Sequence, residues 1–332
     1  MNENIKHDIA VYAAYVEDNK ELMECSSGGI ATAISRQVIR SGGYVAGVAY
    51  SDDFYSAGYR IAHTEEELER FKGSKYIDVD KGSIYKDVKQ LLEAGETVLF
   101  FGVPCIVAAM KAYLKEDYDR LITCQLICEG PTSMEVHRQY VEYLEKRFGS
   151  KITDFSVRRK KTAWIPKYLY AKFENGRVYE MNFRRTEYCY AFKVYAKESC
   201  YNCSFKGDNR RGDMTLGDFW GAKETDAFWN DKGISSVFVH TEKARELLLN
   251  TEGIKVFETD FERATADNPM LLKSRSRRPE RDKFEKLLRK RGLIYAAKHS
   301  MRFKDRIAVT LKRMMPSSLE KLIKKLMGLL RR

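Results

Sequence analysis

The sequence lacks any apolar stretch that approaches the roughly 20 residues needed for a membrane-spanning helix. The residues from Met1 to Asp8 also lack the apolar core that a signal peptide carries. These absences predict a cytoplasmic protein. The hydrophobic content of 44% over 332 residues is enough to fill a sizeable core, in one large or two modest domains.

The cysteines do not suggest a disulfide framework. Their number is odd, at seven, and they are spread over a long chain that has no export signal. This pattern favours reduced thiols and metal ligation.

The sequence contains no zinc-finger or RNP signature, and its positive charge is concentrated at one end. Leu272 to Arg332 holds 21 Lys and Arg against 5 Asp and Glu, whereas the preceding residues hold 38 against 42. The body is therefore mildly acidic, and the formal charge of +12 does not indicate a nucleic-acid partner.

Strand and helix patterns alternate through the first half of the chain. We expect strands at 8–16, 44–50, 97–102 and 121–128, and helices at 28–40, 84–94, 106–115 and 133–148. Thr64 and Glu67 form a capping box that opens a further short helix. This alternation predicts an α/β fold with a largely parallel sheet flanked by helices.

The pattern changes after Gly149. Further strands are expected at 153–158, 168–174, 177–183, 214–217 and 235–240, with a helix at 242–249. Asn175-Gly176 predicts a hairpin turn between two of these strands. We therefore divide the chain into an α/β domain (1–150), a mixed α+β segment (151–250) and a basic helical C-terminal extension (251–332).

Cys200 and Cys203 form the only Cys-x-x-Cys of the chain. Two thiolates at this spacing can bind one metal centre, but they cannot complete a tetrahedral or cubane site alone. Cys105 and Cys128 each follow a predicted parallel strand, at the edge of the sheet where ligands collect. If the second segment folds over this edge, the four thiolates meet. Their number suits zinc and a 4Fe-4S cluster alike, although two single cysteines from distant turns favour a cluster.

The remaining cysteines, Cys25, Cys124 and Cys189, have no such setting. Cys124 lies inside a predicted strand, Cys189 in a predicted helix, and Cys25 before a glycine turn. We interpret all three as small hydrophobic side chains.

Two turns have the composition of ligand-binding loops. Ser26-Ser-Gly-Gly29 lies between the first strand and the first helix, where backbone N–H groups and the helix dipole favour a phosphate. Gly73-Ser-Lys-Tyr76 offers a cation and an aromatic ring. Each also has an ordinary explanation, as a tight turn and as a loop with a solvated lysine.

Six short motifs follow one another within about residues 8 to 245. They are Ser26-Ser-Gly-Gly29, Gly73-Ser-Lys-Tyr76, Gly102-x-Pro-Cys105, Leu126-Ile-Cys-x-Gly130, Cys200-Tyr-Asn-Cys-x-Phe-Lys206 and Thr215-Leu-Gly-Asp-Phe-Trp-Gly221. In this order they resemble the coenzyme F420 hydrogenase/dehydrogenase beta subunit family. The resemblance implies that the chain binds FAD and a 4Fe-4S cluster. It also implies that Cys105, Cys128, Cys200 and Cys203 hold iron and sulfide.

The same resemblance implies a flavin site in the first domain. Its residues are Ser27, Gly28, Gly29, Ser74 and Lys75, near the flavin phosphates or ring. Arg158, Lys160 and Trp164 lie in a stretch that also resembles the family and would line the same cleft, or would form a solvated strand end with a packed tryptophan. No residue is assigned to catalysis itself.

The chain departs from the family pattern in several places. Val103 and Ile106 replace the usual Thr and Gln, and Glu129 replaces the usual His. The N-terminal ferredoxin module of many members is absent, so electrons are expected to come from a separate ferredoxin-like protein. Many bacterial relatives are associated with surface-polysaccharide pathways, where deazaflavin is not an expected substrate.

These observations predict a flavin and iron-sulfur oxidoreductase acting on a small-molecule hydride donor or acceptor. A flavin takes up a hydride and releases single electrons, which a cluster accepts one at a time. The alternative is a non-catalytic, zinc-stabilised scaffold or assembly protein that docks at a membrane through its basic tail.

Residues 316–332 read as an amphipathic helix. One face carries Leu319, Leu322, Ile323, Leu326 and Leu330, and the other carries lysines. Such a helix suits the anionic inner face of a membrane, which would make the protein peripheral there. Packing of the apolar stripe on the body or on a second subunit is the alternative.

We predict that the chain sediments with anionic liposomes and that deletion of residues 316–332 removes this binding. Attraction of about 1 kcal/mol per basic residue near anionic lipid should weaken as salt is added. Equal sedimentation of the full chain and the shortened chain, or of neither, would remove the membrane role of this helix.

Overall fold

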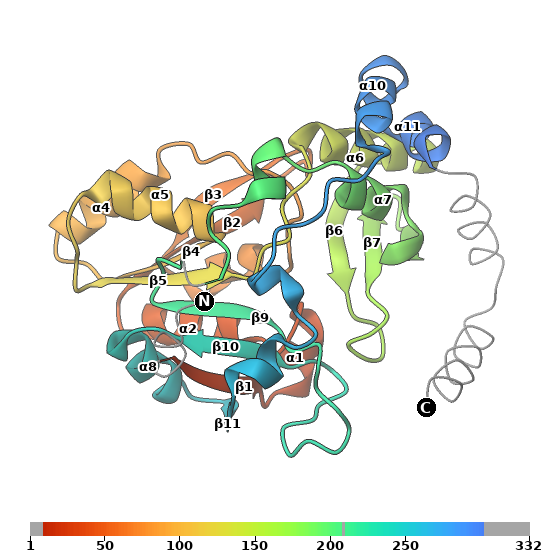
Figure 1. Cartoon of the computed structure of the whole chain (residues 1–332). Helices are drawn as coiled ribbons and strands as arrows, with labels where there is room; N and C mark the ends of the chain where they lie inside the picture. Colours follow the sequence, from red (N-terminus) through yellow and green to blue (C-terminus); the bar gives the residue numbers. More distant parts are fainter. Residues whose placement is uncertain (1–8, 208–209, 302–332) are drawn as a thin grey trace.

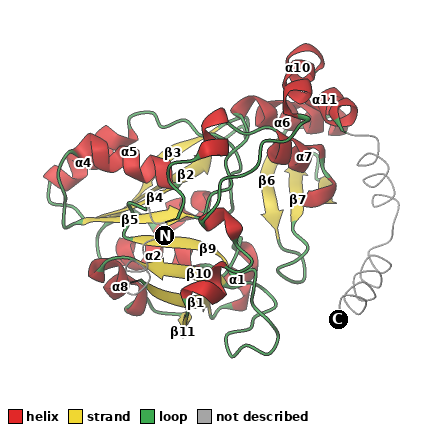
Figure 2. Cartoon of the chain, viewed as in Figure 1, coloured by secondary structure: helices red, strands yellow, loops and turns green. Residues whose placement is uncertain are grey.

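The computed structural model describes residues 9–207 and 210–301, and its centre is an eight-stranded sheet (Figures 1 and 2). The strand order is β11-β1-β10-β9-β5-β4-β2-β3. The strands are β1 (Ala10–Val16), β2 (Tyr44–Tyr50), β3 (Ala57–Ala62), β4 (Val98–Gly102), β5 (Leu121–Leu126), β9 (Met214–Asp218), β10 (Ser235–Val239) and β11 (Ile254–Thr259).

The strand pairings give this sheet a parallel centre. β2, β4, β5 and β9 pair in parallel, and β1 runs in the same direction because it is antiparallel to β10, which is antiparallel to β9. β3, β10 and β11 run the opposite way. The expected α/β class is confirmed, and the carboxyl ends of five strands lie at one edge of the sheet.

Helices cover both faces of the large sheet. α2 (Ile30–Arg40) and α8 (Glu242–Leu249) bury Ile34 and Leu248 against one face. α4 (Ile84–Glu93) and α5 (Pro104–Leu114) cover the other face at the β2–β5 end, and α9 (Phe261–Thr265) covers it near β1 and β10. The short helices α1 (Asn19–Glu24) and α3 (Glu65–Leu68) lie on the same face as α2 and α8.

A second, smaller sheet of order β6-β7-β8 packs with helices beside the first. Its strands are β6 (Ile152–Arg159), β7 (Tyr168–Phe173) and β8 (Val178–Asn182), and its helices are α6 (Met134–Phe148), α7 (Glu187–Val194), α10 (Arg281–Arg291) and α11 (Leu293–Ser300). One apolar cluster joins these elements, with Tyr140, Tyr188 and Phe284 fully buried. The antiparallel pairing of β7 with β8 confirms the hairpin expected at Asn175-Gly176.

The chain returns from the small sheet to the large one. After α7 it passes through a 3-10 turn, η4 (Glu198–Asn202), and enters β9 beside β5. The large sheet therefore takes strands from the 1–150 and 151–250 segments and, through β11, from the 251–332 segment. The change of pattern after Gly149 coincides with the start of the small sheet.

Several short elements were not anticipated. α1, β3 and β11 are six residues each, which is too short to show the strong apolar pattern that sequence reasoning needs. β11 also contains no fully buried residue. The capping box at Thr64 and Glu67 is confirmed at the start of α3. No helix within residues 9–207 and 210–301 is long and apolar enough to cross a membrane. The amphipathic helix expected at 316–332 lies outside the described residues.

Gly28 is packed directly against the backbone of the sheet. A Cβ at this position would lie 2.3 Å from the Ala14 carbonyl oxygen and 2.6 Å from the Ser235 nitrogen. Since both atoms belong to the main chain of central strands, neither can move without disturbing the β1–β10 pairing.

We predict that Gly28→Ala lowers the free energy of unfolding by about 3 kcal/mol, as overpacking against fixed atoms does. Gly42→Ala is the matched control, because Gly42 has a φ of +81° but no neighbour within 4 Å of its added Cβ. The control should lose only about 1 kcal/mol, from backbone strain. Denaturant unfolding monitored by circular dichroism measures both, and equal losses would contradict the packing argument.

Candidate functional site

The structure brings the four singled-out cysteines to one region at the carboxyl edge of the large sheet. Cys105 lies in the first turn of α5, directly after β4, and Cys128 follows the neighbouring strand β5. Cys200 lies in η4, and Cys203 is the residue after it. Their thiols affect one another: burial raises the pKa of Cys128 to about 11, and the Cys105 and Cys200 thiols add to the rise. Burial and then Cys203 and Cys200 raise the pKa of Cys105.

A glycine lies between two of these thiols. Gly130 has a φ of +98°, which favours glycine, and its N–H donates to Cys128 Sγ at 3.2 Å. A Cβ on Gly130 would lie 3.0 Å from Cys200 Cβ and 3.2 Å from Cys200 Sγ. The side chains of Cys128 and Cys200 therefore contact the same residue, in a space that any other side chain would fill.

Buried cations tie the Cys-x-x-Cys segment to its surroundings. Lys206 Nζ donates to the carbonyl oxygens of Cys128 at 2.5 Å and Met270 at 2.6 Å. Arg210 Nη2 donates to the Leu271 carbonyl at 2.9 Å, while its Nε and Nη1 are buried without a partner in the structure. Burial lowers the pKa of Arg210 to about 10, and the nearby Cys128 and Cys203 thiols oppose this effect.

The thiols are not arranged around a single point. Within the part of the chain that is described, no three His, Cys, Asp or Glu side chains are placed to hold one metal ion. Cys25, Cys124 and Cys189 are buried elsewhere, as expected for small hydrophobic side chains. Cys124 and Cys189 belong to two different apolar clusters.

The two ligand-like turns meet each other directly. The backbone N–H and the hydroxyl of Ser74 both lie 3.1 Å from Ser26 Oγ, to which they donate. The turns are 48 residues apart in sequence, so this contact depends on the fold. It places the Gly73-Ser-Lys-Tyr76 turn beside the end of the Ser-Gly turn that precedes α2.

Part of the Ser-Gly turn is already engaged by the sheet. Ser27 Oγ donates to the Ile234 carbonyl at 2.9 Å, and the Gly28 N–H donates to Ser235 Oγ at 3.1 Å. Gly29 is the left-handed N-cap of α2, and no side chain caps this helix. Gly28 is thus explained by packing, and the open hydrogen-bonding groups of the turn are those at the start of α2.

Two lysines, the buried Lys160 and the half-buried Lys167, hold the outer part of the Ser-Gly turn. Lys160 Nζ donates to the carbonyl oxygens of Leu22 and Ser27, both at 2.6 Å, and Lys167 Nζ donates to the Ser26 carbonyl at 2.5 Å. Burial lowers the pKa of Lys160 to about 8. Burial, together with the charge of nearby cations, lowers the pKa of Lys167 to about 5.

Aromatic rings and one ion pair adjoin these lysines. Arg158 forms a two-point ion pair with Asp218, at 2.9 and 2.8 Å, and both side chains are nearly buried. Trp164 and Trp220 stack with ring centroids 4.9 Å apart, and Lys167 Nζ lies 5.1 Å from the centre of the Trp164 ring. The buried Trp164 Nε1 has no hydrogen-bond partner in the structure.

Lys75 lies apart from this group. Its amine donates to the carbonyl oxygens of Arg70, Phe71 and Lys72, and so caps the turn that precedes it. Burial lowers its pKa to about 7. These bonds give Lys75 a structural role, and a contact with flavin stays a prediction.

Some residues of this region were not predicted. Lys206 belongs to the Cys-x-x-Cys motif, and Asp218 belongs to the motif that runs from Thr215 to Gly221. Charged residues within these motifs could therefore have been named as partners of the thiols and of Arg158. Lys167 and Arg275 gave no sequence signal, since their contacts come from distant segments. Arg275 also explains a departure from the family pattern, because its guanidinium pairs with Glu129 at 3.1 Å.

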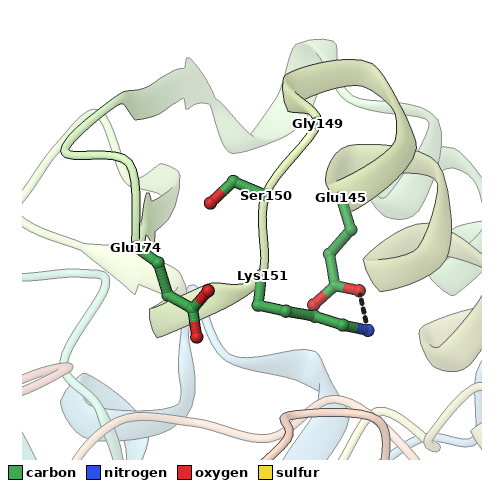
Figure 3. A pocket seen from close by; sticks show the side chains of 5 residues that line it. All are labelled: Glu145, Gly149, Ser150, Lys151 and Glu174. Atoms are coloured by element: carbon green, nitrogen blue, oxygen red, sulfur yellow. Dashed lines mark hydrogen bonds and ion pairs between the residues drawn. The ribbon is translucent and has the colours of Figure 1, made fainter.

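A surface depression of about 490 Å³ lies elsewhere (Figure 3). It is lined by Glu145, Gly149, Ser150, Lys151 and Glu174. Lys151 and Glu145 pair across it at 2.8 Å. None of the predicted site residues lines this depression, and its one lysine, Lys151, is already paired with Glu145.

Comparison with known proteins gives two family matches. Residues 11–83 match the N-terminal part of the coenzyme F420 hydrogenase/dehydrogenase beta subunit, and residues 95–262 match its C-terminal part. No curated protein matches the sequence. The fold is similar to that of a chain of the F420-reducing NiFe hydrogenase complex from Methanosarcina barkeri, with 18% identity, a TM-score of 0.52, and 87% of this chain and 90% of that chain covered. The chain belongs to the coenzyme F420 hydrogenase/dehydrogenase beta subunit family, a family of oxidoreductases.

Proposed function

We propose that this chain is an FAD- and 4Fe-4S-dependent oxidoreductase subunit. It would pass electrons between a small-molecule hydride donor or acceptor and a ferredoxin-like protein. The observation that carries the proposal is the convergence of two sites at one edge of the sheet. The thiols of Cys105 and Cys128 follow β4 and β5, while the Ser-Gly turn follows β1 and α1 at the same edge.

The thiol region has the properties that a cluster needs. All four donors are cysteines, which are the usual ligands of iron-sulfur clusters. Gly130 leaves open the space between Cys128 and Cys200. The unpaired N–H groups of Arg210 and the amine of Lys206 supply buried positive charge next to thiolates. Buried donors of this kind stabilise cluster sulfur and tune its potential.

The number of thiols does not by itself choose the metal. A tetrahedral zinc ion and a cubane cluster can each take four thiolates. The proposal takes the cluster because the family resemblance implies it, and the zinc-stabilised scaffold remains the alternative that metal analysis tests.

The Ser-Gly turn supports the flavin part of the proposal. α2 is 11 residues long and begins at Gly29 without a side-chain cap, so its first N–H groups are available to a phosphate. Lys160 and Arg158 bring positive charge close to this turn, against the single carboxylate of Asp218. Lys167, whose pKa burial lowers to about 5, adds an amine that a bound anion would help to protonate. A dinucleotide with phosphate groups would find suitable partners here.

The cofactors, when bound, would convert between hydride and single-electron transfer. The protein's own residues hold and shield them. Lys160 and Lys167 fix the turn through its carbonyl oxygens, and the rings of the Trp164–Trp220 stack pack against Lys167. The pathway that supplies the substrate, including one for surface polysaccharides, stays a prediction from the resemblance.

We predict that Cys→Ala at position 105, 128, 200 or 203 lowers the bound iron, because each change removes one of the four ligands. Iron and acid-labile sulfide, measured on protein prepared without oxygen, give the test. Cys124→Ala and Cys189→Ala are controls for the loss of a buried thiol and should keep the wild-type iron content. Wild-type protein that is colourless and holds one zinc would establish the scaffold instead.

A charge placed in the Ser-Gly turn tests the flavin site. Ser26→Asp keeps an acceptor for the two Ser74 donors but adds a negative charge near the expected phosphates. We predict that it weakens FAD binding at least about tenfold, or ~1.4 kcal/mol. Ser26→Asn is the matched neutral control and should bind FAD like the wild type. Titration followed by flavin fluorescence measures both, and equal affinities for Asp and Asn would contradict the placement.

A further inference from the structure

One of the four thiols opens to solvent. Cys105 is exposed, whereas Cys128, Cys200 and Cys203 are half-buried. The surface around Cys105 is apolar: α5 continues outward with exposed Ala109, Ala112 and Tyr113. Leu126, at the end of the neighbouring strand β5, is 39% exposed. A group held by these thiols would therefore approach the surface at Cys105, beneath an apolar patch.

A basic segment, residues 271–281, runs along the Cys-x-x-Cys segment. Cys203 N–H donates to Ser274 Oγ at 2.9 Å, and Gly207 N–H donates to the Leu271 carbonyl at 3.0 Å. Arg275 reaches across to the Gly130 carbonyl at 3.3 Å. The basic segment is thus hydrogen-bonded to the thiol region through Leu271, Ser274 and Arg275.

The charge of the basic segment is only partly neutralised. Arg275 pairs with Glu129, and Arg277 and Arg281 share Glu198 and Asp282. Lys273 and Arg278 are exposed, and neither forms an ion pair with the described part of the chain. Arg211, which follows the half-buried Arg210, is also exposed. Positive charge without an ion-pair partner among the described residues therefore lies on the segment that is hydrogen-bonded to the thiol region.

We propose that this surface, defined by Cys105, Leu126, Arg211, Leu272, Lys273 and Arg278 and here called the thiol face, docks an acidic redox protein. The inference rests on the proposed function and adds the site and chemical class of the electron partner. Unpaired exposed cations attract an acidic surface over a Debye length, and exposed Leu126 and Leu272 supply apolar contact once the partner is seated.

The electron balance fits such a partner. In each encounter one electron leaves the partner's reduced centre, which is oxidised, and enters the group held by the thiols, which is reduced. Two encounters supply two electrons, and these with one proton from water make up one hydride equivalent. A carrier that must dock and leave twice for each turnover needs fast, salt-sensitive association, which exposed charge provides.

Electron transfer from a reduced plant-type ferredoxin, a small acidic iron-sulfur protein, tests the proposal in stopped-flow experiments on the full-length holoprotein. The double variant Lys273→Glu/Arg278→Glu should lower the second-order rate by about tenfold or more at low salt, and the loss should shrink as salt is added. The matched control is Lys146→Glu/Lys172→Glu. It makes the same change in net charge at exposed positions on α6 and β7 and should stay within about twofold of the wild type.

Reduction by dithionite separates the possible failures. Dithionite needs no docking surface, so it should reduce the wild type and both double variants alike. If it reduces none of them, the proposed function is wrong. If it reduces all of them while ferredoxin rates are equal in the two double variants, only the docking proposal is overturned. A third outcome also overturns the docking proposal. If Lys273→Glu/Arg278→Glu loses binding to anionic vesicles but keeps the wild-type ferredoxin rate, the thiol face binds lipid.

Discussion

Buried amines and guanidinium groups that donate to main-chain carbonyl oxygens hold the functional edge of this protein together. Lys160 and Lys167 bind carbonyls of the Ser-Gly turn, Lys206 binds those of Cys128 and Met270, and Arg275 binds those of Gly130 and Phe192. Each bond joins segments far apart in sequence. A cation must be paired or hydrogen-bonded to be buried, and carbonyl acceptors achieve this without adding an opposing charge. The loops at this edge are therefore fixed, and groups that keep their protons, such as the Arg210 guanidinium, whose pKa burial lowers to about 10, leave the edge positive.

That retained charge connects the architecture to the proposed cofactors. Thiolates carrying iron and sulfide, and the phosphates of a dinucleotide, are all anionic groups that would be costly to place in a neutral interior. Here Arg210 keeps two buried N–H groups without protein partners beside Cys128 and Cys203, at a cost that a bound acceptor would offset. The zinc-stabilised scaffold gives no reason for the second group of cations around Ser26 and Ser27, whereas a second anionic cofactor does.

Sequence reasoning identified the α/β class and the position of Cys105 and Cys128 at the carboxyl edge because each depends on local pattern, whereas the ligand role of the four thiols stays a prediction. Strands such as Val98–Gly102 are continuous apolar runs, and a cysteine directly after such a strand must lie at its end. It did not identify the antiparallel outer strands β3 and β11, whose short and half-exposed sequences carry little pattern. It could not place Lys167 or Arg275 either, because their partners are 141 and 145 residues away. The role of Gly28 was also hidden, since the carbonyl that excludes a side chain there belongs to β1.

The turn from Gly73 to Tyr76 explains why the two sites share one edge. Ser74 contacts Ser26 of the Ser-Gly turn, while Tyr76 stacks on Phe192 at 4.6 Å. Arg275 lies 5.2 Å from the centre of the Phe192 ring and holds the carbonyl of Gly130, which touches two of the thiols. A chain of direct contacts therefore links the thiols to the start of α2 through a few side chains. Electron exchange between two cofactors requires such closeness, and a parallel sheet provides it because its strand ends converge on one edge while the loops after them remain free to carry different chemistry.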